Sequence, residues 1–191
     1  MKNSFDEKIL EEANDWLTVN KKVILATVIQ TWGSSPRQVG SRMIVNEKGD
    51  FSGSVSGGCV ETAVVRECLN LLKEKKNFKK IEFKVSNESA WEVGLACGGQ
   101  IAIFLEQINW MKKKLLTEII KKKKNKTEFA IVTNLDNGDC CLFEENKKLD
   151  NAFEQYKDKI ALQFKIKNNG IIKGTNIFVE NYIRPIKVII V

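Results

Sequence analysis

Two cysteines within glycine-rich segments are the residues of this 191-residue chain best suited to chemistry. Cys59 directly follows Gly57-Gly58, and Cys97 directly precedes Gly98-Gly99. Glycine lets the main chain approach a ligand closely, while thiolates bind soft metals. The chain contains no histidine, which excludes the usual catalytic triads and most zinc hydrolase sites. We therefore predict one small-molecule site that carries both thiols.

The segment around Cys59 is expected to begin a helix that runs to about Lys75. With Gly58 as N-cap, Cys59 takes the first helical position and Glu61 the third, from which a carboxylate can reach back to cap the helix. The N–H groups of this first turn would form an anion site and lower the pKa of the Cys59 thiol. The alternative is that Cys59 only fills a small gap, since a free cysteine is usually buried and inert.

A second candidate for anion binding is the loop that carries Ser34, Ser35 and Arg37 between two glycines. Hydroxyl groups and a planar guanidinium suit a phosphate or another oxo-anion. Only four of the 31 basic residues are arginines, and two of these, Arg37 and Arg42, lie in this part of the chain. For the two serines alone, an ordinary serine–proline turn is the stronger interpretation.

The other three cysteines are expected to be structural. Cys68 falls on the apolar face of the expected helix, while Cys140 and Cys141 lie on a strand and face opposite sides. The sequence has no C-x-x-C pair and no four-ligand spacing, so a zinc site is not expected. The glycine-rich segments also lack the P-loop and dinucleotide-binding patterns.

Apolar periodicity supplies the elements that must position these residues. It predicts strands over residues 22–29, 42–46, 51–55, 81–85, 101–105, 128–134, 139–143, 160–166 and 176–182, and helices over residues 1–17, 59–75, 109–126 and 150–156. The expected fold is α+β, a single domain with a mixed β-sheet flanked by helices. The loops at residues 33–40, 56–59 and 94–99 are expected to converge on it.

The net charge of +7 does not point to nucleic acid. The segment Asn109–Lys126 holds eight lysines and one acid, so it accounts for the whole excess. The pattern is typical of a helix with a solvated basic face. It lacks the arginines that nucleic-acid binding favours, and Trp110 is its one aromatic residue. No apolar run approaches the length of a membrane span, and no signal peptide is recognised. With five cysteines and no paired spacing, we expect a cytoplasmic protein that contacts neither nucleic acid nor membrane.

Three linked segments resemble the XdhC/CoxI family of xanthine dehydrogenase accessory proteins. They are Gly33–Gly40, Gly53–Glu61 and Gly94–Gly99, and the match in order and spacing runs from about Val23 to Glu106. The resemblance implies a protein that binds molybdenum cofactor (molybdopterin) and holds it during sulfuration by a cysteine desulfurase. It further implies delivery to a molybdenum hydroxylase of the xanthine dehydrogenase type.

Carried onto these motifs, the resemblance and the residue chemistry together give a set of cofactor-binding residues and assign no catalytic residue. Cys59 and Cys97 are placed near the metal or its sulfur. The full set is Ser34, Ser35, Arg37, Arg42, Ser56, Gly57, Gly58, Cys59, Glu61, Cys97, Gly98 and Gly99.

Family members typically have two domains, the second of them Rossmann-like. We expect residues 1–184 to form the cofactor-binding domain and residues 185–191 to be the first strand of a second domain whose glycine loop the sequence lacks. A separate Rossmann-type partner chain would supply the rest, unless the second domain has been removed. We also expect a homo-oligomer.

Two alternatives stay open. Cys59 could act as a persulfide carrier or nucleophile in a thiol enzyme, although the sequence shows no base partner for it. The chain could instead be the structural half of a heteromer, in which the strand ending at Val191 pairs with another chain.

Overall fold

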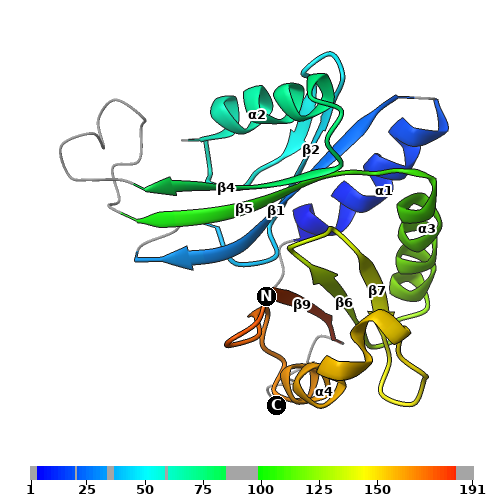
Figure 1. The fold of residues 1–191 in the computed structure, drawn as a ribbon. Coiled ribbons are helices and arrows are strands. Elements are labelled where there is room, and N and C mark those ends of the chain that lie inside the picture. The colour runs from blue at the N-terminus through cyan, green and yellow to red at the C-terminus, as the bar shows by residue number, and fades with distance from the viewer. Residues whose placement is uncertain (1–3, 20, 34–36, 59, 85–98, 184–191) are drawn as a thin grey trace, which may run out of the picture.

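The computed structural model describes residues 4–19, 21–33, 37–58, 60–84 and 99–183, and these form two antiparallel sheets with helices between and around them (Figure 1). The α+β class predicted from the sequence is confirmed. Every described strand pair is antiparallel, in two sheets, where one mixed sheet was expected. The elements in chain order are α1 (Ser4–Thr18), β1 (Val23–Trp32), β2 (Arg42–Asn46), β3 (Phe51–Gly53), α2 (Glu61–Lys73), β4 (Phe78–Lys84), β5 (Gln100–Gln107), α3 (Trp110–Lys124), β6 (Phe129–Asn134), β7 (Cys140–Phe143), the 3-10 helix η1 (Asn151–Tyr156), α4 (Lys157–Lys165), β8 (Gly170–Ile171) and β9 (Ile177–Tyr182).

The first sheet has the order β3-β2-β1-β5-β4 and is built around β1, whose apolar, β-branched sequence suits a strand covered on both faces. On one face, Val64, Cys68 and Leu71 of α2 pack against apolar side chains of β1, β2 and β5. On the other face, α1 and α3 pack against the sheet and against β6 of the second sheet. Strands β1, β5 and β4 project side by side beyond this core (Figure 1).

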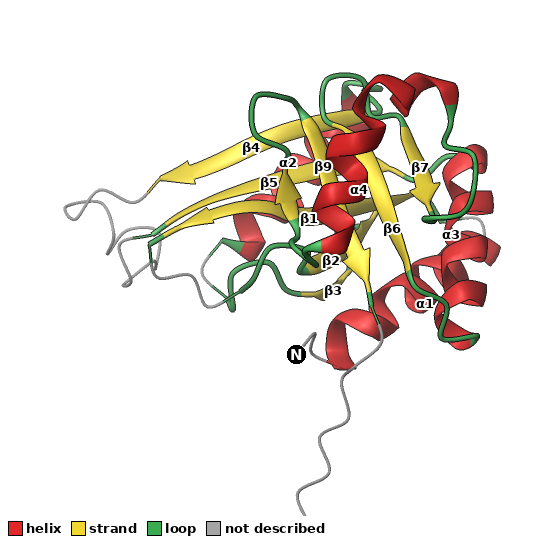
Figure 2. Cartoon of the chain, turned by 90° about the horizontal axis from the view of Figure 1, so that it is seen from below, coloured by secondary structure: helices red, strands yellow, loops and turns green. Residues whose placement is uncertain are grey.

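The second sheet has the order β7-β6-β9-β8, and η1 and α4 cover one of its faces (Figure 2). The prediction of a strand over residues 160–166 is wrong, because Lys157–Lys165 forms α4. The misleading signal is the alternation of four large apolar residues, Ile160, Leu162, Phe164 and Ile166. Ile160 and Phe164, which are four residues apart as helical spacing requires, pack on the sheet. Leu162 and Ile166 are 60% and 57% exposed.

A buried ion pair between Arg42 of β2 and Glu180 of β9 connects the two sheets. Nη1 of Arg42 donates to Glu180 Oε1 at 2.8 Å and to the Tyr182 hydroxyl at 2.7 Å, and Nη2 donates to Oε2. Burial by itself would lower the pKa of Arg42, but its charge interactions with Glu180 and Tyr182 outweigh burial and raise the pKa above its ordinary value. The guanidinium therefore stays charged in the interior.

Gly40 leaves room for this pair. Its φ of +91° favours glycine, and a Cβ at this position would lie 3.1 Å from Glu180 Oε1. The first motif loop thus ends where the second sheet contributes its buried carboxylate. Among the described residues, no helix is both long and apolar enough to cross a membrane.

The Glu180→Gln variant tests the importance of this ion pair. It leaves the buried Arg42 charge uncompensated, so the free energy of unfolding in urea should fall by about 3 kcal/mol or more. Glu82→Gln is the matched control, because the Lys80–Glu82 pair is solvent-exposed (42% and 41%) and should contribute at most about 1 kcal/mol. Equal losses in the two variants would contradict the structural role given to Arg42.

Candidate functional site

The first and third motif segments meet at one end of the first sheet. Trp32, the last residue of β1, pairs with Gln100, the first residue of β5. Gly33 directly follows the first of these residues, and Gly99 directly precedes the second. The loop that leaves β1 and the loop that enters β5 therefore join the sheet at neighbouring points (Figure 1).

The second motif segment is connected to the first through Arg37 and Ser54. Arg37 Nε donates to Ser54 Oγ at 3.3 Å, and the arginine side chain is half-buried. The first loop then returns to β1, where Val28 and Gly40 share a 2.8 Å main-chain hydrogen bond. The first motif is therefore connected to the second, and it leaves the sheet beside the point where the third enters. Convergence of all three loops stays a prediction, because residues 34–36, 59 and 94–98 lie outside the described residues.

Glu61 organises the second segment. Its side chain is buried, and it lies at the start of α2 directly after the turn that leaves β3. The carboxylate accepts hydrogen bonds from four consecutive main-chain N–H groups and two serine hydroxyls. These donors are N–H of Val55 (3.1 Å), Ser56 (2.9 Å), Gly57 (3.1 Å) and Gly58 (2.9 Å), and Oγ of Ser54 (2.7 Å) and Ser56 (2.6 Å).

This network keeps Glu61 ionised. Burial alone would raise the pKa of its carboxyl, but hydrogen bonds from the Ser56 and Ser54 hydroxyls and from the main chain lower it to about 2. Gly57 and Gly58 have φ of +91° and +122°, in the left-handed region that glycine tolerates best. The glycine pair is therefore required to turn the main-chain N–H groups toward the carboxylate.

The predicted position of Cys59 is corrected by the observed helix start. The helix begins at Glu61 with Val60 as its N-cap, so Cys59, which lies outside the described residues, precedes the helix and does not occupy its first position. Glu61 does reach back, as expected, and its carboxylate accepts from the N–H groups of residues 55–58, which precede the helix. A phosphate aimed at those four N–H groups would have to compete with an internal anion, while an anion site at the first turn of α2 stays a prediction.

The predicted site residues fall into four groups. Ser56, Gly57, Gly58 and Glu61 form one network, with Arg37 attached to it through Ser54. Arg42 belongs to the ion pair between the sheets, and Gly99 lies next to the start of β5. Ser34, Ser35, Cys59, Cys97 and Gly98 lie outside the described residues, as does the segment 185–191.

Sequence reasoning missed two residues of this region. Ser54 accepts from Arg37 and donates to Glu61, so it links the first motif to the second. Trp32 is 42% exposed at the point where two motif loops meet the sheet. A large aromatic residue directly before the first motif glycine is the signal that could have revealed it.

The three described cysteines have the inert character expected of structural thiols. Burial raises the pKa of Cys68, Cys140 and Cys141 to about 12 in each case. Within the described part of the chain, no group of three or more potential ligands could hold a metal ion. Metal or sulfur contact by Cys59 and Cys97 remains a prediction.

Comparison with known proteins agrees with the motifs. Residues 16–83 match the model of the XdhC and CoxI family, so the predicted resemblance is confirmed over these residues. The chain is 34% identical over 101 residues to the molybdenum cofactor insertion chaperone PaoD of Escherichia coli (strain K12), a match that covers 52% of this chain and 31% of that protein. It is 31% identical over 96 residues to a probable xanthine dehydrogenase subunit from Bacillus subtilis (strain 168), a match that covers 49% of this chain and 29% of that protein.

The fold is also similar to a solved structure. A crystal structure of a xanthine dehydrogenase from Bacillus halodurans superimposes with a TM-score of 0.67 and 21% sequence identity, over 93% of this chain and 52% of that one. At this identity the likeness shows the fold alone. The chain thus spans less than a third of PaoD and the Bacillus subtilis protein and about half of the solved structure.

Replacing Glu61 with Gln tests the network by its pH dependence. The folded-state pKa of about 2 lies below the ordinary value of 4.5, so the carboxylate contributes stability above pH 4.5 that is lost as the pH falls through about 2. The full contribution is about 3 kcal/mol. Between these pH values the free energy of unfolding of the parent should therefore rise more steeply with pH than that of the variant.

Glu67→Gln is the control on the same helix, since the Glu67 carboxylate pairs with Lys79 at the surface and should contribute at most about 1 kcal/mol. Parallel pH profiles for the parent and Glu61→Gln would contradict the role of Glu61.

Thiol alkylation tests the cysteine assignment. With pKa values raised to about 12, Cys68, Cys140 and Cys141 hold very little thiolate at pH 7 and should react slowly with iodoacetamide. Peptide mapping after brief exposure should therefore find label first on Cys59 and Cys97. Labelling of Cys68 at the same rate as Cys59 would be inconsistent with this division.

Proposed function

We propose that this chain holds molybdenum cofactor for insertion into a molybdenum hydroxylase of the xanthine dehydrogenase type. Two observations carry the proposal. The first and third motifs join the sheet at one strand end, through the Trp32–Gln100 pairing, and the Arg37–Ser54 hydrogen bond connects the first motif to the second. The similarity to a molybdenum cofactor insertion chaperone supports the choice of ligand.

The chemistry of the cofactor matches groups that these segments carry. Its phosphate calls for charge-assisted hydrogen bonds, which Arg37 with Ser34 and Ser35 would donate. Its metal, already held by the sulfur atoms of a dithiolene, suits soft ligands, which Cys59 and Cys97 would provide. Glycines at positions 57, 58, 98 and 99 would let the main chain lie close to a flat ring.

Two residues of the predicted set act through others in this proposal. Glu61 holds the Ser54–Gly58 turn in place and so positions the segment that leads to Cys59. Arg42 holds the first motif against the second sheet through Glu180. Both are positioning residues, and the phosphate contact falls to Arg37.

Cellular context follows from the same proposal. The chain would work in the cytoplasm, receive sulfur from a cysteine desulfurase and pass the cofactor to the hydroxylase. A Rossmann-type partner chain is also proposed, as the resemblance to a two-domain family implies. A homo-oligomer is also proposed.

Anaerobic purification followed by molybdenum and pterin analysis tests the proposal directly. The parent chain should retain both, with or without a Rossmann-type partner. Mass spectrometry of Cys59 on the same sample separates cofactor retention from a persulfide-carrying enzyme. Absence of pterin and molybdenum from every preparation would overturn the proposal.

Substitution of Arg37 gives the sharper prediction. A charge-assisted hydrogen bond contributes about 1.5–3 kcal/mol, so Arg37→Ala should weaken pterin retention by about one to two orders of magnitude. Arg37→Lys should recover only part, because an ammonium cannot form the bidentate contact of a guanidinium.

The matched control is Arg66→Ala, an exposed arginine on α2, which should retain pterin as the parent does. Cys59→Ser and Cys97→Ser should reduce molybdenum or sulfur more than pterin. Equal loss in the Arg37 and Arg66 variants would show that retention reflects overall charge.

A further inference from the structure

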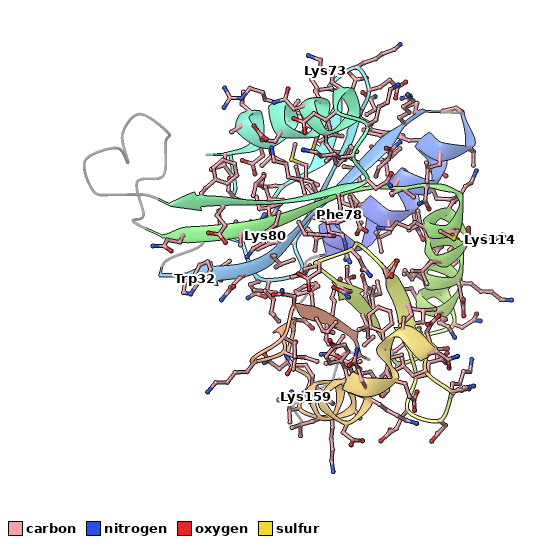
Figure 3. All side chains as sticks on the ribbon, in the orientation of Figure 1. Trp32, Lys73, Phe78, Lys80, Lys114 and Lys159 are labelled. Atoms are coloured by element: carbon pink, nitrogen blue, oxygen red, sulfur yellow. The ribbon has the colours of Figure 1, made fainter. Side chains whose placement is uncertain are left out.

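Trp32 is an exposed aromatic side chain at the point where two motif loops meet the sheet. It lies at the end of the projecting strands (Figure 3) and is 42% exposed. Gly33 directly follows Trp32 in the chain. Gln100, the cross-strand partner of Trp32, is directly preceded by Gly99. Trp32 and Gln100 are held by strand pairing, so their positions are fixed by the sheet.

Strand register places Trp32 with amide side chains on one face of the sheet. Residues directly opposite in an antiparallel pair share a face, and faces alternate along each strand. Ile101, opposite Thr31, packs in the cluster with α2, whereas Ala102, opposite Gln30, packs on the other side with Phe104 and Phe178. Trp32, Gln100 and Gln30 therefore face away from α2.

A bulge in β1 makes this arrangement possible. The register shifts between Val28 and Gln30, and Val28 packs on the α2 side. Without the extra residue, strict alternation would turn Gln30 and Trp32 toward α2 as well. The bulge therefore aims the indole at the face opposite α2, and re-aiming a side chain is a usual effect of a β-bulge beside a functional site.

We infer that Trp32 is the platform on which the flat heterocycle of the ligand stacks, with the amides of Gln100 and Gln30 at the ring edge. The inference rests on the proposed function, because it assigns a part of the same ligand to a further residue. An indole offers a large π-face at low entropic cost, and a glutamine amide offers both donors and an acceptor. Pterin presents a flat ring with donors and acceptors on its edge, so the two kinds of group match it.

This assignment separates the ring from the phosphate. Arg37 is attached to Ser54 next to the Glu61 network, while Trp32 lies five residues earlier at the strand end. Removing the charge of Arg37 should therefore leave the ring contact unchanged, and removing the indole of Trp32 should leave the phosphate contact unchanged. The two contributions can be removed one at a time.

Binding of two fluorescent probes tests the inference: an oxidised pterin with a phosphorylated side chain, and the same pterin without phosphate. Loss of stacking weakens binding by about ten- to hundredfold, so Trp32→Leu should bind both probes that much more weakly. Trp32→Phe keeps an aromatic face and should bind within about threefold of the parent, while the tryptophan quenching caused by the probe should fall. Arg37→Ala should weaken only the phosphorylated probe.

Phe51→Leu is the matched control, because Phe51 is an exposed aromatic residue (52%) on β3, an edge strand of the same sheet. It should bind both probes as the parent does, and all variants should keep the far-UV circular dichroism of the parent. Trp32→Leu that binds both probes as tightly as the parent overturns the stacking assignment, and that result marks the indole as a contact for a protein partner.

The anaerobic preparations keep this failure distinct from failure of the proposed function. A parent chain that retains molybdenum and pterin, together with a Trp32→Leu chain that retains as much, removes only the role of Trp32. A parent chain that retains neither molybdenum nor pterin overturns both the proposed function and the role of Trp32.

Discussion

The carboxylate of Glu61 is the interaction on which the motif region depends. Four consecutive main-chain N–H groups point at one side chain, and this is possible only because Gly57 and Gly58 adopt positive φ. Hydrogen bonds to a charged acceptor are stronger than those to a neutral one. The Ser54–Gly58 turn therefore has one fixed conformation, although it has no regular secondary structure. The start of α2, the path toward Cys59 and the anchoring of Arg37 all follow from it.

A second buried carboxylate, that of Glu180, connects the motif region to the other sheet through Arg42. This contact could not be predicted from the sequence. Arg42 and Glu180 are 138 residues apart, and no local pattern reveals that they meet. The sequence alone therefore favours an anion-binding role for Arg42 within the first motif.

The short-range elements were predictable, because β1, β5 and the β6–β7 hairpin carry strong apolar and turn signals. The helix α4 was not, because its apolar residues alternate while only helical spacing places them on the sheet.

The candidate site shows the same division between local and tertiary information. The sequence located the three segments and predicted that Glu61 would reach back across the turn. It misplaced the helix start by two residues, because a capping argument cannot tell whether a carboxylate will take one N–H group or a whole turn of them. Trp32 was missed because its exposure depends on the register shift in β1, which is a property of strand pairing and not of composition.

The order of charges along the network constrains how an anionic ligand can lie. Ser54 accepts from Arg37 and donates to Glu61, so a positive group and a buried negative group are joined through one hydroxyl. The main-chain N–H groups of the turn point inward at Glu61, and in a trans peptide each preceding carbonyl points the opposite way. The carbonyl of Gly57 is thus directed away from the carboxylate. A phosphate placed against this turn would meet an acceptor and not a donor, so in the proposed site the phosphate contact falls to the guanidinium of Arg37. Because the Glu61 charge is already satisfied internally, the turn keeps this polarity whether or not a ligand is present.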